Sequence, residues 1–277
     1  MAEKNVDTSI VGKKTFFIAP SPDMIPEEYL QAYLSHGYEC YIVANDSSFP
    51  LAGKIKTIIS LFPDSLLIFD TTVSLPGINW ESYIQDLQKN YGDKITISVI
   101  YSKKWASKEK EHFKSFYTDT AKIQGGFIGL EPNHIKNFER LTRILTKNKV
   151  GGRRKSVRAV CPAGSSVAFA YNAQTYTASL VDMSMTHFCA DIQISGLNIP
   201  IYQRIKDAVI VINGMQFSSD IVLILRRSEK DTVRCIFMFT KQGGMPGLSG
   251  ELETKLATQL HGLLSDSCLK TLKKEYN

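Results

Sequence analysis

The sequence predicts two domains of different class, an α/β domain followed by an all-β domain. Up to about residue 148, short hydrophobic runs alternate with segments whose hydrophobic residues recur at helical spacing. Beyond residue 150 the pattern changes to the alternation of hydrophobic and polar residues that is typical of strands. The chain has 277 residues, a length that suits about two domains, and 43% of them are hydrophobic, which is enough for substantial cores.

Five strand–helix pairs are expected in the first half. The strands are predicted at residues 15–19, 39–44, 65–69, 94–101 and 126–130. The helices that follow them are predicted at residues 26–36, 51–61, 80–90, 107–117 and 133–147. Strands that alternate with helices in this way form a parallel sheet covered on both faces, so we expect a Rossmann-like (βα)5 domain over residues 1–148.

The end of the third predicted strand carries Asp70, in the position where the receiver domains of two-component signalling have their phosphoacceptor, and the domain resembles a receiver. The acidic pair that receivers have after the first strand is replaced by residues 19–22, Ala-Pro-Ser-Pro, and Glu131 stands where they have lysine. Phosphoryl transfer to a carboxylate needs a magnesium ion held by acidic side chains. We therefore expect a degenerate receiver-like domain in which Asp70 caps a strand end. The alternative is a phosphorylatable response regulator.

The second half is predicted to form a six-stranded antiparallel barrel followed by a helix. The strands are expected at residues 166–171, 175–183, 188–194, 208–213, 220–227 and 233–240. Short strands at this spacing avoid exposed sheet edges by closing into a barrel. Leucines recur at helical spacing in residues 249–264, which predicts a helix that caps the barrel.

A basic segment, residues 149–158, is expected to link the two domains. Two glycines in it precede Arg153, Arg154 and Arg158, and glycine frees the backbone to fold around a ligand. Each guanidinium offers paired N–H donors, which fit a phosphate or the O6/N7 edge of guanine. The alternative is a solvated basic linker, because most short charged runs are solvated.

Asp182 and Ser184 lie two residues apart on a predicted strand, where such residues point to the same face. A carboxylate there can accept hydrogen bonds from N1 and N2 of a guanine whose other edge an arginine holds. Together with the arginines, Asp182 and Ser184 therefore indicate a clamp for a purine nucleotide.

The order Arg154-x-x-x-Arg158 and then Asp182-x-Ser184 resembles the two-part signature of PilZ domains, RxxxR followed by [D/N]xSxxG. The resemblance covers roughly residues 151–277. PilZ domains are receptors for cyclic di-GMP, so it implies a PilZ β-barrel with a C-terminal helix over residues 159–277. It also implies a ligand-binding set of Arg153, Arg154, Arg158, Asp182, Ser184 and His187. In that family an arginine directly before RxxxR goes with binding of an intercalated dimer of the ligand.

His187 departs from the signature because it stands where the family has glycine. An imidazole fills space where glycine allows close approach, so the ring turns outward, contacts the ligand, or weakens the pocket. The resemblance implies a non-enzymatic cyclic di-GMP effector whose domains rearrange on binding and which signals to a protein partner, such as one of a motility or secretion apparatus. The alternative is a ligand-free docking module with a pocket damaged by His187.

Composition limits the other classes of function. The net charge of +6 favours an anionic ligand without indicating a specific nucleic-acid partner, and Arg226, Arg227 and Arg234 either extend a ligand surface or are solvated. The five cysteines lack the CxxC spacing of zinc sites, and no apolar run reaches the ~20 residues that span a bilayer. Residues 1–14 lack the hydrophobic core of a signal peptide. We therefore expect a cytoplasmic protein without catalytic residues, metal, cofactor or membrane insertion.

Overall fold

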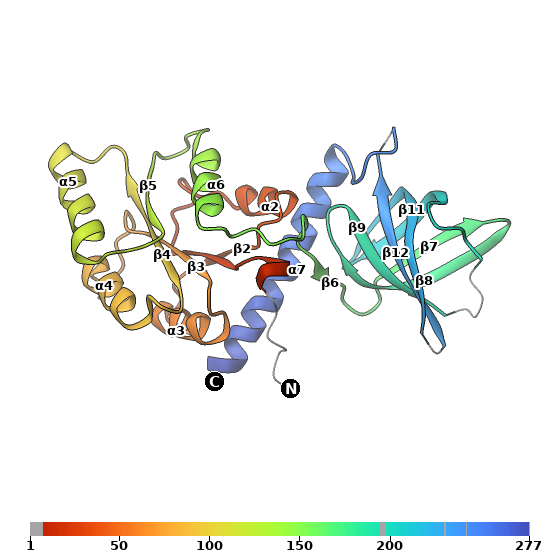
Figure 1. Cartoon of the computed structure of the whole chain (residues 1–277), viewed down its shortest axis with the longest axis horizontal. Coiled ribbons are helices and arrows are strands. Elements are labelled where there is room, and N and C mark those ends of the chain that lie inside the picture. Colours follow the sequence, from red (N-terminus) through yellow and green to blue (C-terminus); the bar gives the residue numbers. More distant parts are fainter. Residues whose placement is uncertain (1–7, 194–197, 230, 242, 277) are drawn as a thin grey trace. The chain divides into compact units, whose positions relative to one another are not determined.

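The computed structural model describes residues 8–193, 198–229, 231–241 and 243–276 (Figure 1). The chain divides into two compact units. The first unit comprises Met1–Lys155 and Cys268–Asn277, and the second unit comprises Ser156–Ser267. The last helix, α7 (Glu251–Tyr276), is divided between them at Cys268.

The first unit contains a five-stranded parallel sheet with the order β2-β1-β3-β4-β5. Its strands are β1 (Thr15–Ile18), β2 (Cys40–Val43), β3 (Leu66–Asp70), β4 (Thr96–Ser102) and β5 (Gly126–Leu130). All residues of β1 and β3 are buried, as expected for strands that are covered on both faces. The predicted α/β class is confirmed, and the strand order is that of doubly wound folds of the flavodoxin type.

Helices cover both faces of this sheet. They are α2 (Glu27–Ser35), α3 (Leu51–Leu61), α4 (Trp80–Tyr91), α5 (Ser107–Ser115) and α6 (Asn137–Lys147). Figure 1 shows α2 and α6 on one side of the sheet, where Leu30 of α2 and Leu141 of α6 join one hydrophobic cluster with Phe17 of β1. The structure differs from the prediction at three places. It has an additional short helix α1 (Thr8–Val11), and a short π-helix η1 (Phe116–Thr120) follows α5. Helix α6 begins at Asn137, later than the predicted residue 133.

The second unit is a closed barrel of six antiparallel strands, which confirms the predicted all-β class. Its strands are β7 (Ser166–Tyr171), β8 (Gln174–Met183), β9 (His187–Ile192), β10 (Arg204–Ile212), β11 (Met215–Glu229) and β12 (Thr232–Thr240). They pair in the order β8-β7-β10-β11-β12-β9, and β9 returns to pair with β8. A short strand β6 (Ala159–Val160) adds to the edge of β8.

Strand β11 begins earlier than predicted. The turn Asn213-Gly214 joins it directly to β10, so that Ile212 pairs with Met215. Both turn residues have positive φ, 46° and 80°, as a two-residue type I′ hairpin requires. The polar Ser218 and Ser219 interrupt the hydrophobic alternation without ending the strand, because pairing with β10 continues through both.

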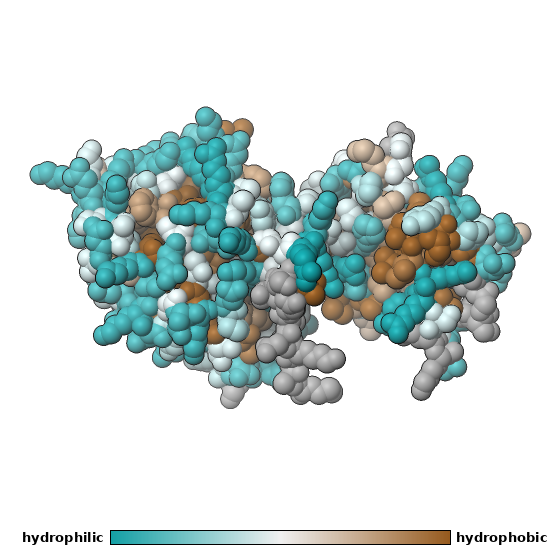
Figure 2. Space-filling model, in the orientation of Figure 1, coloured by the Kyte–Doolittle hydropathy of each residue, from teal (hydrophilic) through white to brown (hydrophobic). Residues whose placement is uncertain are grey.

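Alternate residues of β12 fill the barrel core. Phe237 and Phe239 are buried and pack on Phe188 of β9, with ring centroids 5.2 and 5.1 Å apart. Figure 2 shows hydrophobic side chains gathered on the outer surface over β11 and β12. Leu225 and Ile236, which pair there across the two strands, are respectively exposed and half-buried.

Helix α7 extends twelve residues beyond the predicted end at residue 264. Residues 265–267 are polar but contain neither glycine nor proline, so nothing in them stops a helix. Within the second unit Leu256 and Leu260 of α7 are buried, and in the first unit Tyr276 packs on Phe49 with ring centroids 4.4 Å apart. Among the helices that the structure describes, none combines the length and apolar character needed to cross a bilayer.

Candidate functional site

The two parts of the sequence signature meet on the second unit. Strand β6 pairs antiparallel with the end of β8, so that Val160 lies opposite Asp182. This pairing carries Arg158, which precedes β6, to the carboxylate: Arg158 Nη1 lies 3.3 Å from Asp182 Oδ1. The two side chains remain 34% and 28% exposed, so solvent reaches this ion pair.

A β-bulge places Asp182 on the outer surface of the barrel. The register of β8 against β9 shifts between Leu180 and Asp182, so that Val181 is the additional residue. The carbonyl of Val181 accepts a hydrogen bond of 2.9 Å from the backbone N–H of Cys161, and Met183 is fully buried in the barrel. Asp182 is therefore directed outward, between two residues whose positions are fixed.

Ser184 has a structural role in the turn between β8 and β9. The sequence predicted that Ser184 lies beside Asp182 on an extended strand. Strand β8 ends at Met183, however, so Ser184 lies beyond the strand. Its side chain is buried, with 1% exposed. Its hydroxyl oxygen accepts a hydrogen bond of 3.1 Å from the backbone N–H of His187, while its own N–H donates to the carbonyl of His187 at 2.8 Å.

His187 opens β9 and lies half-buried at the edge of the site. Its Nδ1 is 2.8 Å from the hydroxyl of Thr186, which in turn lies 3.2 Å from the hydroxyl of Ser156. Burial, and secondarily the positive charge of Arg158, lowers the pKa of His187. Because Nδ1 is engaged by Thr186, Nε2 is the ring nitrogen that can meet a ligand.

Arg153 and Arg154 belong to the first unit, unlike the other four predicted site residues. The backbone N–H of Arg154 donates to the carbonyl of Ile10 at 3.0 Å, and the N–H of Lys13 donates to the carbonyl of Val150 at 2.8 Å. A Cβ added at Gly152 would lie 2.3 Å from the backbone nitrogen of Gly12. Gly152 therefore allows close packing of two backbone segments, whereas the sequence predicted that it gives flexibility.

A second ion pair on β9 and β12 was not predicted from the sequence as part of the site. Arg234 holds Asp191 by two parallel hydrogen bonds of 2.8 Å, and this contact lowers the pKa of Asp191. His187 and Asp191 of β9 are half-buried, and Cys189, which lies between them on the same face of the strand, is buried. Cys189 lies opposite Asp182. The period of two along the predicted strand was the signal that could have placed Asp191 on this surface.

Asp70 caps the end of β3, as predicted. It is fully buried, and its Oδ2 accepts a hydrogen bond of 2.9 Å from the N–H of Ser21. Its Oδ1 accepts hydrogen bonds of 3.0 and 2.5 Å from the N–H and hydroxyl of Thr72. Both carboxylate oxygens are therefore engaged by the protein, as expected of a strand-end cap. In the described part of the chain, no group of three or more acidic, histidine or cysteine side chains is placed to hold a metal ion.

Comparison of the chain with protein-family models finds no match, and comparison with curated proteins finds none. Solved structures do match. They include a PilZ domain of YcgR with c-di-GMP from Escherichia coli, at 16% identity and a TM-score of 0.34 over 43% of this chain and 96% of that chain. YcgR in complex with c-di-GMP matches at 19% identity and a TM-score of 0.38, over 44% of this chain and 51% of that chain.

A third match is the MrkH–c-di-GMP complex of K. pneumonia, at 16% identity and a TM-score of 0.34, over 45% of this chain and 57% of that chain. The chain thus matches about half the length of the YcgR and MrkH chains. Likeness at this level does not assign a function, which must be argued from the residues of the site.

Proposed function

We propose that the barrel is a PilZ-type receptor for cyclic di-GMP and that the protein is a non-enzymatic effector. The observation that carries this proposal is the contact between Arg158 and Asp182 on the outer surface of the barrel. A guanidinium fork beside a carboxylate offers donors to the O6/N7 edge of a guanine and an acceptor to its N1 and N2. The same fork can instead hold a phosphate, and cyclic di-GMP contains both groups.

The ion pair can open for a ligand at small cost. A single contact of 3.3 Å between two partly exposed groups contributes about 0–1 kcal/mol to stability. A ligand that offers a guanine edge to Asp182 and a phosphate or a second edge to Arg158 replaces that contact by several charge-assisted hydrogen bonds. The turn held by Ser184 supplies the fixed geometry beside them.

Arg153 and Arg154 complete the site in this proposal. The side chain of Arg154 is exposed. Because Arg154 belongs to the first unit and Arg158 to the second, a ligand that engages both arginines favours some arrangements of the units over others. That shift is the signal a protein partner would read, with a component of a motility or secretion apparatus as the expected partner.

Isothermal titration with cyclic di-GMP tests the proposal. We expect micromolar or tighter binding by the full chain and its loss in Arg154→Ala and Arg158→Ala. Arg143→Ala, which removes the same charge from an exposed position on α6, serves as the control. The arginine before the signature, Arg153, predicts two ligands per chain, and a stoichiometry of one would contradict the intercalated dimer. Absence of binding by the folded wild type would overturn the receptor function.

Small-angle scattering tests the rearrangement separately. With saturating cyclic di-GMP we expect a change in the radius of gyration of the full chain, and Asp182→Ala, which removes the guanine acceptor, should abolish that change. Identical scattering with and without ligand would contradict the rearrangement while leaving the binding intact.

A docking module that binds no nucleotide is the second candidate. The hydrophobic surface over β11 and β12 favours it, because exposed apolar patches mark interaction surfaces (Figure 2). In this case the wild type does not bind cyclic di-GMP, and His187→Gly, which restores the signature, creates affinity for it. If the variant also does not bind cyclic di-GMP, His187 was not the obstacle.

A further inference from the structure

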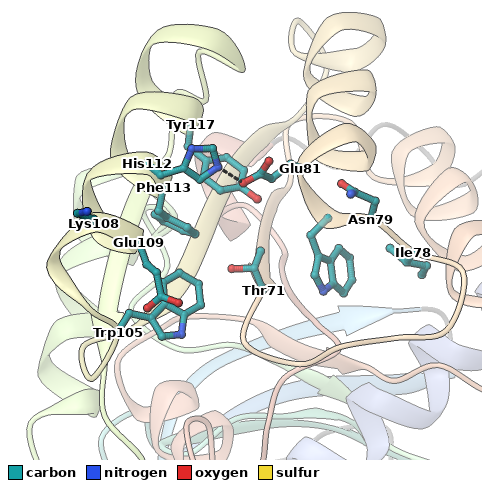
Figure 3. Close-up of a pocket in the computed structure, with 11 residues that line it drawn as sticks. Thr71, Ile78, Asn79, Glu81, Trp105, Lys108, Glu109, His112, Phe113 and Tyr117 are labelled. Carbon is teal, nitrogen blue, oxygen red and sulfur yellow. Dashed lines mark hydrogen bonds and ion pairs between the residues drawn. The ribbon is translucent and has the colours of Figure 1, made fainter.

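The first unit contains a cavity that the nucleotide site does not use. It has a volume of about 590 Å³ and lies between α4 and α5 (Figure 3). This volume falls within the range of about 300–1,000 Å³ that is typical of sites for small organic ligands. Thr71, which directly follows β3, lines it, so the cavity opens at the carboxyl edge of the sheet. Ligands of open α/β sheets bind along that edge.

The usual crevice at this edge is closed. In the order β2-β1-β3-β4-β5 the direction in which strands are added to the sheet switches between the parallel strands β1 and β3, and there Asp70 accepts a hydrogen bond from the backbone N–H of Ser21. The cavity lies farther along the same edge, toward β4. The degenerate receiver site is therefore occupied by its own side chains, while a neighbouring site of different chemistry is open.

Aromatic rings form the walls of the cavity. Trp80 is fixed: it is 8% exposed and its indole N–H donates to the carbonyl of Val73 at 2.7 Å. Trp105, half-buried, packs edge-on against Phe113 with ring centroids 5.3 Å apart. The chain has only two tryptophans, and both line this cavity. Indole faces carry negative charge density and attract cations.

Two carboxylates stand at the cavity, one from each helix. Oε1 of Glu81 on α4 lies 2.8 Å from Nε2 of His112 on α5, and this hydrogen bond joins the two helices (Figure 3). Glu109 of α5 accepts the N–H of Ala106 at 2.8 Å through its Oε2. The second oxygen of each carboxylate has no hydrogen-bond partner among the described residues. Lys108 of α5 also lines the cavity, so two carboxylates and one ammonium contribute to its lining, and Figure 3 shows Lys108 farther from Thr71 than Glu109 is.

We propose that this cavity binds a small organic cation, a ligand that carries an ammonium or guanidinium group on an apolar or aromatic stem. The cation would lie against the Trp105 face and donate a hydrogen bond to the free oxygen of Glu109, while the stem would fill the space between the indoles. Cations over tryptophan are stabilised in this way, and the carboxylates exclude an anion of the same shape. This site is independent of the proposed nucleotide site.

Intrinsic fluorescence tests the proposal, because both tryptophans report on this cavity and the nucleotide site has none. The probes are phenethylamine and agmatine as cations, and hydrocinnamate as an anion of nearly the same shape as phenethylamine. We expect a saturable change in tryptophan emission with a cation and none with hydrocinnamate. An arginine-containing tripeptide with blocked ends reveals whether the same chemistry is accepted from a protein side chain. An equal response to hydrocinnamate, or no response to any cation, would overturn the proposal.

Matched variants locate the binding. Glu109→Gln keeps an acceptor for the N–H of Ala106 but removes the charge, and should weaken phenethylamine binding roughly three- to fivefold. Glu111→Gln removes the same charge from an exposed position on the same helix and should leave binding unchanged. Trp105→Leu, followed through Trp80, should abolish the response. Equal affinities of Glu109→Gln and Glu111→Gln, with Trp105→Leu still responding, would place the binding elsewhere.

Discussion

At the scale of single residues, the nucleotide signature contains two kinds of side chain. Asp182 and Arg158 form a partly exposed ion pair that can exchange partners, whereas the hydroxyl of Ser184 is buried in a turn. The sequence predicted that these residues belong together. It did not predict their different roles, because a serine beside an aspartate looks the same whether its hydroxyl faces a ligand or the backbone.

Substitutions at Ser184 and Asp182 should separate the two roles. Ser184→Ala leaves the N–H of His187 without its acceptor and should lower the free energy of unfolding by about 1–3 kcal/mol. Asp182→Asn removes only a partly exposed ion pair and should lower it by less than about 1 kcal/mol while weakening cyclic di-GMP binding. Urea denaturation of both variants measures the first effect, and titration measures the second. Equal loss of stability in the two variants would contradict the division.

The lowered pKa of His187 should make stability depend on pH. Because burial lowers its pKa in the folded state, the unfolded chain takes up a proton more readily. The stabilising contribution is therefore fully present above the unfolded pKa of about 6.5 and is lost as the pH falls through the folded value. Between pH 7 and pH 5, His187→Asn should lose less stability than the wild type in urea denaturation at each pH. Parallel pH profiles would show that the titration of His187 is not linked to folding.

At the scale of elements, strand and helix types followed from the sequence, whereas several of their ends did not. Alternation in β12 and unbroken hydrophobic runs in β1 and β3 are direct consequences of which faces are buried. The bulge at Val181 and the full length of α7 depend on pairing and packing with distant residues. Local patterns contain no record of such contacts, so they locate an element better than its ends.

Two glycine substitutions should have opposite effects on the barrel and its helix. Gly214 has φ of 80° in the β10–β11 turn, so Gly214→Ala forces a side chain into the left-handed region and should cost about 1–2 kcal/mol. Gly262 lies within α7, where an added Cβ meets nothing within 4 Å. Gly262→Ala should therefore stabilise the protein by about 0.5–1 kcal/mol. Thermal unfolding of the two variants compares them, and a stabilised Gly214→Ala would refute the turn assignment.

At the scale of the whole molecule, the boundary between the two units lies inside the arginine signature, after Lys155. The sequence predicted one flexible linker over residues 149–158. Its first part is instead held against residues 10–13 by backbone hydrogen bonds, such as that from Arg154 to Ile10. This contact joins segments some 140 positions apart, and it was invisible in the sequence because the polar residues before the first strand showed no pattern.

Gly152 is the residue on which this anchoring depends. In Gly152→Ala the new methyl group would meet the backbone nitrogen of Gly12 at 2.3 Å, and backbone at both sides must move to relieve the clash. We expect a loss of about 1–3 kcal/mol in the stability of the first unit. Faster amide exchange should appear at Lys13 and Arg154, whose N–H groups make the anchoring bonds, while the barrel core is unchanged.

Because Arg153 and Arg154 would then have to be ordered at the moment of binding, cyclic di-GMP affinity should also fall in Gly152→Ala. Gly164→Ala, at a glycine whose added Cβ meets nothing within 4 Å, also lies at positive φ and controls for general strain. Unchanged exchange at Lys13 and Arg154 in Gly152→Ala would show that the segment is held by other contacts, and unchanged affinity would show that its anchoring does not prepare the arginines for the ligand.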